Sequence, residues 1–198
     1  MAERPAANGA LSKEVDLLRR ENSHLRRHLA LLSTTAARVA STLDVDAVLQ
    51  AVVNAACELT SARFGALSLA DSPAGEARFY THGLREEERR AIGAPPIGLG
   101  VLGLVRQLGR PVRLADVTKH ERFLGFPAGH PSLRSFLGVP VQEEGAAIAS
   151  LYVAEKTGDA EFSPEDEELL SLFAQQAARA IRNARLFVAE QKARALAE

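Results

Sequence analysis

The chain has 198 residues, of which 46% are apolar and 25% are charged. This length and composition are typical of one globular domain with an appended segment. Lysine and arginine (24 residues) almost balance aspartate and glutamate (25 residues), which leaves a formal net charge of -1. Because no general positive field exists to attract phosphates or anionic lipids, we expect neither a nucleic acid nor a membrane as a partner.

Cys57 is the only cysteine, so an internal disulfide is excluded. Its apolar helical surroundings indicate a small buried side chain in a reducing compartment rather than a redox thiol. The first residues lack the apolar core of a signal peptide, and no stretch approaches the roughly 20 apolar residues that span a bilayer. The sequence therefore predicts a cytoplasmic protein.

The segment at residues 11–40 carries a seven-residue repeat that predicts a coiled-coil dimerisation helix, after a disordered tail at residues 1–10. The two seams of the repeat consist of Leu11, Leu18, Leu25 and Leu32 and of Val15, Asn22, Leu29 and Ala36. A buried Asn in a seam, here Asn22, pairs with its symmetry mate and favours a parallel homodimer. The alternative is a single amphipathic helix that packs on its own domain.

Residues 41–187 show helical and strand periodicities that predict one α/β (α+β) domain, with a C-terminal helix extension at residues 188–198. The first helix runs to about Thr60, and Asp44 is a candidate cap. The strand patterns are Arg63–Ala70, Ala77–His82, Pro111–Leu114, Phe136–Gln142 and Ala146–Glu155, with helices at Leu84–Ile92 and Val101–Leu108. Short turn sequences join the first two strands and the last two, which predicts two hairpins.

Ala115–Ser132 is predicted to be a long polar loop, and loops of this length in a compact domain are usually functional or mobile. The final helix is predicted to begin with Ser163 as N-cap and Pro164 as its first residue, with acidic residues over its positive end. Its expected apolar face consists of Leu169, Leu172, Phe173, Gln176, Ala177, Ala180, Ile181, Ala184 and Phe187.

The segments LDVDAVLQAVVNAACELTSARFGALSL, LRSFLGVPV, LYVAEK and FSPEDEELLSLFAQQAARAIRNARLF resemble a GAF domain over about residues 33–187. The resemblance implies a six-stranded antiparallel sheet with flanking helices. It also implies a non-catalytic module that binds a small molecule or merely dimerises, and that signals through its terminal helices to a kinase or another regulator. No nucleophile elbow, HExxH motif or Cys-His arrangement points to an enzyme.

Within the family, RFGALSL, RPVRLADV, GFPAGHPSLRSFLGVPV and LYVAEK resemble the haem-binding first GAF domain of DevS/DosS-type sensor histidine kinases, which are two-component sensors. This likeness implies haem b as a cofactor, with His130 as the proximal iron ligand and Tyr152 on the side where a diatomic gas binds. The residue types suit these roles, since a neutral imidazole ligates haem iron and a phenol can hydrogen-bond a bound ligand. Ser150 shares a strand face with Tyr152 and is expected to line the pocket.

Tyr80 and His82 lie at places where the haem-binding relatives are expected to have apolar residues. They either crowd the pocket, or His82 acts as a second axial ligand. The leading expectation is a sensor of a diatomic gas or of redox state, homodimeric through its N- and C-terminal helices, that signals to an effector. Two other interpretations stay open, namely a cofactor-free dimerisation and interaction module and a domain that binds a small apolar metabolite.

Overall fold

The computed structural model describes residues 44–69, 79–92 and 100–197. The predicted tail at residues 1–10 and the predicted coiled coil at residues 11–40 lie outside these ranges. The predicted turn at residues 71–76 also lies outside them.

Five strands of the described residues form one antiparallel sheet in the order β2-β1-β5-β4-β3. The strands are β1 (Ala62–Leu69), β2 (Phe79–His82), β3 (Val112–Leu114), β4 (Phe136–Glu143) and β5 (Ala146–Lys156). The expected six-stranded sheet is thus five-stranded in the described part of the chain. The sixth strand was implied by family resemblance alone, whereas the residues themselves show five strand patterns.

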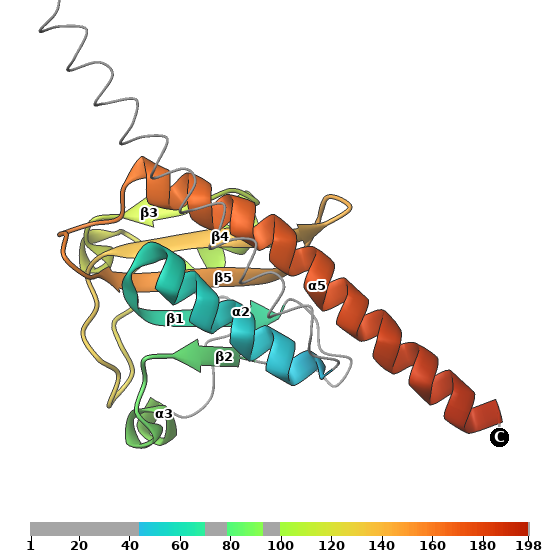
Figure 1. The fold of residues 1–198 in the computed structure, drawn as a ribbon. Helices are drawn as coiled ribbons and strands as arrows, with labels where there is room; N and C mark the ends of the chain where they lie inside the picture. The colour runs from blue at the N-terminus through green and yellow to red at the C-terminus, as the bar shows by residue number, and fades with distance from the viewer. Residues whose placement is uncertain (1–43, 70–78, 93–99, 198) are drawn as a thin grey trace, which may run out of the picture. The chain divides into compact units, whose positions relative to one another are not determined.

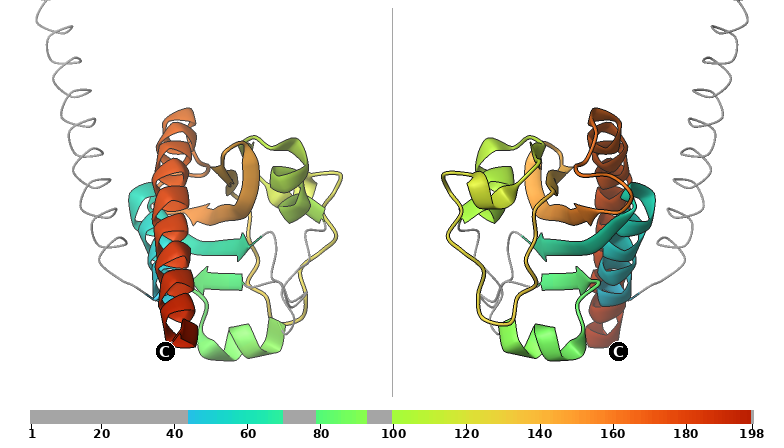
Figure 2. Two further views of the ribbon diagram at one scale, coloured as in Figure 1. Left: turned by 90° about the vertical axis from the view of Figure 1, so that its right-hand side faces the viewer. Right: turned by 90° about the vertical axis from the view of Figure 1, so that its left-hand side faces the viewer.

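The two faces of the sheet carry different layers. Figure 1 shows α2 and α5 in front of the strands, and the side views of Figure 2 separate the layers. The helices α2 (Val45–Thr60) and α5 (Pro164–Ala197) pack against each other on one face. The helix α4 (Gly100–Leu108), the short 3-10 helix η1 (Val117–Lys119) and the loop after it lie over the other face. The short helix α3 (Glu86–Ile92) follows the edge strand β2.

The helix α2 begins at the cap that the sequence predicts. The carboxylate of Asp44 accepts a hydrogen bond from the backbone N–H of Asp46 at 2.9 Å, which satisfies one of the free donors of the first turn. The helix ends at Ser61, which has the left-handed φ of 50°. Its apolar side, spaced at three and four residues, is buried and consists of Val48, Leu49, Val52, Val53, Ala55 and Ala56.

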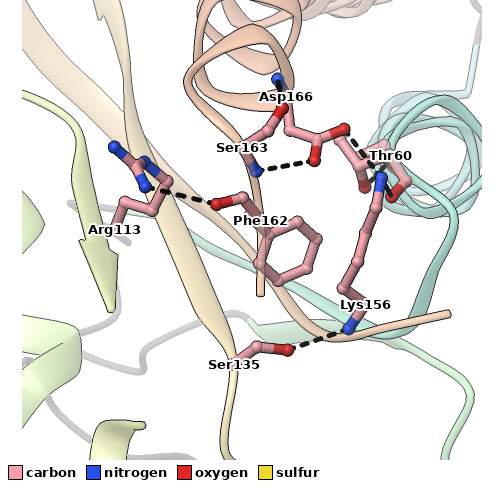
Figure 3. A network of polar contacts seen from close by, with 8 residues as sticks. Thr60, Arg113, Ser135, Lys156, Phe162, Ser163 and Asp166 are labelled. Atoms are coloured by element: carbon pink, nitrogen blue, oxygen red, sulfur yellow. Dashed lines mark hydrogen bonds and ion pairs between the residues drawn. The ribbon is translucent and has the colours of Figure 1, made fainter. Parts of the chain in front are cut away.

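The helix α5 also begins as predicted, because the hydroxyl of Ser163 accepts from the N–H of Asp166 at 3.2 Å. The carboxylate of Asp166 accepts in return from the N–H of Ser163 at 2.9 Å. Lys156, at the end of β5, places its Nζ 2.8 Å from this carboxylate and 3.0 Å from the carbonyl oxygen of Thr60 (Figure 3). These contacts join the ends of β5, α2 and α5 at one point.

The buried face of α5 differs in part from the prediction. Leu172 was expected on this face but is 46% exposed, whereas Leu170 is fully buried. The reason is that α5 packs against both α2 and β4, so its buried stripe is displaced and broad. Within the described ranges, no helix has the length and apolar character that crossing a membrane requires.

Candidate functional site

The sheet face opposite α2 and α5 carries a row of aligned residues from all five strands. The register pairs Thr81 with Ala66, Ala66 with Tyr152, Tyr152 with Gly138 and Gly138 with Val112. Tyr152 therefore stands between two small residues. A Cβ atom at Gly138 would lie 3.0 Å from Cδ1 of Tyr152 and 2.5 Å from Cγ2 of Val105 in α4. The glycine is what allows the Tyr152 ring and α4 to lie so close to β4.

A pocket of about 760 Å³ lies over this row, between the sheet and the elements that cover it. Its volume falls within the range of about 300–1,000 Å³ that is usual for ligand and cofactor sites. The strands contribute Ala66, Thr81 and Ala154, the helix α4 contributes Val101 and Leu102, and the loop after η1 contributes Phe123, Phe126 and His130. The described wall is mostly apolar, with a few polar groups.

Two backbone hydrogen bonds fix the ends of the segment formed by η1 and the loop after it. The N–H of Val117, the first residue of η1, donates to the carbonyl oxygen of Arg134 at 2.8 Å, which joins the start of the segment to its end. At its end, the N–H of Glu155 in β5 donates to the carbonyl oxygen of Ser135 at 3.0 Å. The long polar loop predicted from the sequence is therefore an anchored wall of the pocket.

His130 belongs to this wall, and its ring is stacked on that of Phe126, with centroids 4.9 Å apart and planes within 6°. Phe123 meets Phe126 edge-on at 4.9 Å. Gly129 has a positive φ of 77°, and a Cβ atom there would lie 2.5 Å from the Cβ atom of Ala91 in α3. Gly129 thus lets the loop pass close against α3 just before His130.

The hydrogen bond of His130 fixes which of its ring nitrogens is protonated. Nδ1 lies 2.7 Å from the carbonyl oxygen of Pro131. A carbonyl oxygen can only accept, so in the neutral ring Nδ1 carries the proton and Nε2 keeps its lone pair. None of the described residues forms a hydrogen bond with Nε2. A histidine arranged in this way is suited to bind a metal, because the bond at one nitrogen fixes the tautomer and orients the ring.

Tyr152 lines the pocket from the central strand and is 5% exposed. Its hydroxyl donates to the carbonyl oxygen of Leu102 at 2.9 Å, which ties β5 to the first turn of α4. Burial raises the pKa of the phenol, while a hydrogen bond with Ser150 and the charge of Arg106 act in the opposite direction. Ser150 shares the sheet face of Tyr152, as predicted, but is buried beside it and does not line the pocket.

Tyr80 and His82 make their contacts with α2. The hydroxyl of Tyr80 donates to the carboxylate of Asp46, and Nδ1 of His82 lies 2.9 Å from Oδ1 of Asn54. Because α2 lies across the sheet from the pocket, Tyr80 does not crowd it, and this expectation was wrong. His82 borders the pocket, while its Nδ1 is bonded to Asn54 of α2.

Arg89 of α3 is the only arginine, lysine, aspartate or glutamate among the described residues that line the pocket. Its guanidinium lies 3.9 Å from Glu86, which makes a shorter contact of 3.2 Å with Arg90. The described residues include no group of three or more metal-binding side chains. A metal held by His130 would therefore have to bring most of its ligands with it, as haem iron does.

The sequence placed His130 and Tyr152 in one site, and the structure brings both to the same pocket. Sequence reasoning missed Phe123, Phe126 and Arg89. Aromatic residues inside an otherwise polar loop were the available signal for the two phenylalanines. Arg89 had no such signal, because the charges of α3 are those of an ordinary exposed helix.

Known proteins resemble this chain over most of its length. The family model described as GAF domain matches residues 42–182. The GAF domain of a phosphoenolpyruvate-protein phosphotransferase from Coxiella burnetii is 27% identical with a TM-score of 0.69, covering 82% of this chain and 96% of that one. The corresponding Acinetobacter domain is 26% identical with a TM-score of 0.66, covering 80% and 94%. A free methionine-R-sulfoxide reductase from Neisseria meningitidis, at 22% identity and a TM-score of 0.65, covering 80% and 90%, shares the fold.

A curated relative is the phosphoenolpyruvate-dependent phosphotransferase system protein of Salmonella typhimurium, which is 32% identical over 109 residues. The match covers 52% of this chain and 14% of that protein, so the chain corresponds to a small part of the relative's length. The family match spans the described sheet, α2, α4 and the loop that contributes to the pocket wall. By sequence and by fold, this chain belongs to the GAF domain family.

Proposed function

We propose that this GAF domain is a sensory module that binds haem b in the pocket, with His130 as the iron ligand, and signals a diatomic gas or a redox change to an effector. The observation that carries the proposal is the bond of His130 Nδ1 to the Pro131 carbonyl oxygen, which leaves Nε2 for a metal in the wall of a largely apolar pocket. The resemblance of GFPAGHPSLRSFLGVPV and LYVAEK to haem-binding GAF domains of DevS/DosS-type kinases supports it.

The residues of the pocket suit a large flat cofactor. When bound, haem supplies an iron centre that takes a diatomic gas or changes oxidation state. Phe126 holds the plane of the His130 ring by stacking, and the apolar strand and helix residues exclude water. Tyr152 places a hydroxyl on the floor of the pocket; its proton is bonded to the Leu102 carbonyl oxygen, and its lone pairs can accept a hydrogen bond.

A hydrogen-bonded connection from the pocket to the long helix supports signalling through α5. The backbone N–H of Arg134, in the loop of His130, donates to the carboxylate of Glu155 in β5. The next residue, Lys156, binds Asp166 in the first turn of α5 (Figure 3). Tyr152 lies on the same strand, so a shift of the loop or of β5 is transmitted to the start of α5.

The proposal includes a homodimer that forms through the terminal helices. On α5, Leu172 and Leu186 are 46% and 61% exposed, and their spacing of two heptads places them on one helix face. We expect the double variant Leu172→Glu/Leu186→Glu to be monomeric by light scattering after gel filtration. The variant Leu108→Glu, which changes an exposed leucine of α4, should remain dimeric. A wild-type monomer would reject this part of the proposal.

A second candidate function is the binding of a small apolar metabolite without haem. Tyr152 favours this function because its hydroxyl proton is already bonded to the Leu102 carbonyl oxygen. An apolar ligand would leave this hydrogen bond in place, and the hydroxyl needs no bound gas as a partner. The relatives of 26% and 27% identity are GAF domains of phosphoenolpyruvate-protein phosphotransferases, which makes regulation of such an effector a parallel proposal. A colourless protein stabilised against heat by an apolar ligand would support it.

Cys57 is too buried to serve as a redox-sensing thiol. Cys57 is 3% exposed on α2, and a Cβ atom at Gly65 would lie 2.4 Å from its Sγ atom. Burial, followed by the charge of Glu58, raises the pKa of the thiol to about 12. Since the thiolate is the nucleophile, Cys57 acts as a small apolar core residue, as the sequence predicts.

The deciding experiment is absorption spectroscopy of the haem-reconstituted protein beside a His130→Ala variant. The matched control is His120→Ala, because His120 lies in the same loop, does not line the pocket and accepts from the Arg122 N–H at 3.1 Å. We expect a Soret band in the wild type and in the control, and the spectrum of free haem in the His130 variant. Added imidazole should restore the band in His130→Gly. A wild-type protein that binds no haem would reject the haem function and favour the metabolite.

A further inference from the structure

We propose that the pocket selects ligands that carry a carboxylate, and that Arg89 is the residue that binds it. The inference rests on the proposed function in that it concerns the same pocket. A carboxylate can come from the propionates of haem or from an apolar carboxylic acid, and the chemistry at Arg89 is the same for both.

The described pocket wall carries a positive charge and no acidic side chain. Arg89 lines the pocket, and the described lining residues include neither aspartate nor glutamate. Its guanidinium is 3.9 Å from Glu86, whereas Arg90 approaches the other oxygen of the same carboxylate at 3.2 Å. Glu86 is therefore mainly the partner of Arg90. The guanidinium of Arg89 has five N–H donors in a fork that matches a carboxylate, and this distant contact engages few of them.

The helix α4 adds charge of the same sign. It begins at the pocket, and its first three residues, Gly100, Val101 and Leu102, line the wall. The N–H groups of a first turn carry partial positive charge, and no acidic residue of this turn offsets it. A positive potential inside largely apolar walls favours a ligand that combines an apolar body with an anionic group.

The helix α3, which carries Arg89, lies against the loop that carries His130. Arg89 lies two residues before Ala91, and the Cβ atom of Ala91 is the atom that a Cβ at Gly129 would meet at 2.5 Å. Gly129 is the residue before His130. Arg89 and His130 line the same pocket, so a ligand held by His130 can present its carboxylate to the guanidinium.

The test compares each acid with its uncharged counterpart. Haemin and haemin dimethyl ester, in which both propionates are esterified, are titrated into the wild type, Arg89→Gln and Arg90→Gln and followed by absorbance. The control Arg90→Gln removes a neighbouring charge of α3 that does not line the pocket. In parallel, 1-naphthylacetic acid and its amide are compared by thermal denaturation, which does not depend on haem.

We expect the wild type and Arg90→Gln to bind haemin about tenfold more tightly than the ester, and Arg89→Gln to bind both equally. The preference should weaken as salt is raised, because the guanidinium is half exposed. Equal binding of haemin and its ester by the wild type, or a preference kept by Arg89→Gln, would overturn the inference while haem binding stands. Failure to bind haem, combined with an Arg89-dependent preference for the naphthyl acid, would reject the haem function and support the carboxylate site. Failure of both probe pairs would overturn both.

Discussion

The hydroxyl of Tyr152 and the carbonyl oxygen of Leu102 are 2.9 Å apart, and this hydrogen bond joins the central strand of the sheet to the helix that covers the pocket. Ala66 and Gly138 flank Tyr152 on the neighbouring strands, so the ring passes between two small residues to reach α4. Floor and cover of the ligand pocket are thus linked by one side chain.

Replacing this hydroxyl alone tests how firmly α4 is held. Tyr152→Phe keeps the ring and removes the bond, so we expect the free energy of unfolding to fall by about 1 kcal/mol in urea titrations. Amide hydrogen exchange in α4 should speed up more than in α2, which the bond does not touch. Wild-type stability together with unchanged exchange in α4 would show that the bond does not hold the helix.

The close approach of Gly65 and Cys57 predicts a non-additive pair of substitutions. A Cβ atom at Gly65 would lie 2.4 Å from the Cys57 Sγ atom and 3.2 Å from Val53, so Gly65→Ala should destabilise the domain by about 1–3 kcal/mol. In a Cys57→Ala background the nearest obstacle is gone, and the same glycine substitution should cost at least ~0.5 kcal/mol less. A double-mutant cycle by chemical denaturation measures this difference. Strict additivity would mean that another contact limits position 65.

Stability should fall in alkaline solution because of Cys57. Its folded pKa is raised to about 12, so above the ordinary thiol pKa of 9.0 the unfolded chain loses a proton that the folded chain retains. The free energy of unfolding therefore decreases as the pH rises, and by pH 10 the loss from this group is about 1 kcal/mol. Urea titrations between pH 8 and pH 10.5 should show a steeper decline in the wild type than in Cys57→Ala. Parallel declines would contradict the assignment.

The ion pair of Lys156 and Asp166 is predicted to contribute far more to the free energy of unfolding than the exposed ion pairs do. Both side chains are 12% exposed, so Asp166→Asn or Lys156→Met alone leaves a buried charge without its partner and should cost about 3 kcal/mol. The double variant should be less destabilised than the sum of the two. Arg194→Ala, which breaks an exposed pair with Glu190, should change stability by less than ~0.5 kcal/mol in the same assay. If breaking either pair lowered the free energy of unfolding equally, burial would not strengthen the Lys156–Asp166 pair.

Local chemistry explains the predictions that the structure confirms. Asp44 and Ser163 cap helices because a short polar side chain can reach the free N–H groups of a first turn. The turn at Glu144 and Gly145 has positive φ angles of 49° and 85°, which suits the tight hairpin read from the sequence. Leu172 was misplaced because periodicity shows that a helix has an apolar face but not which neighbours cover it.

The sequence by itself determined the strands and α-helices of the described residues, the caps, the buried cysteine and the family, because these depend on a few residues along the chain. The 3-10 helix η1 lies within the segment that was predicted to be a loop. Only the tertiary structure decided that Phe126 stacks on His130, that Tyr80 turns to α2 and that Arg89 brings the full positive charge to the pocket wall. Tyr80 is distant in sequence from Asp46, and Arg89 is distant from most of the pocket wall. Phe126 and His130 share one loop, and their stacking depends on how that loop is packed. These relationships follow from strand register and from how α3, α4 and the loop pack over the sheet, which no local pattern encodes.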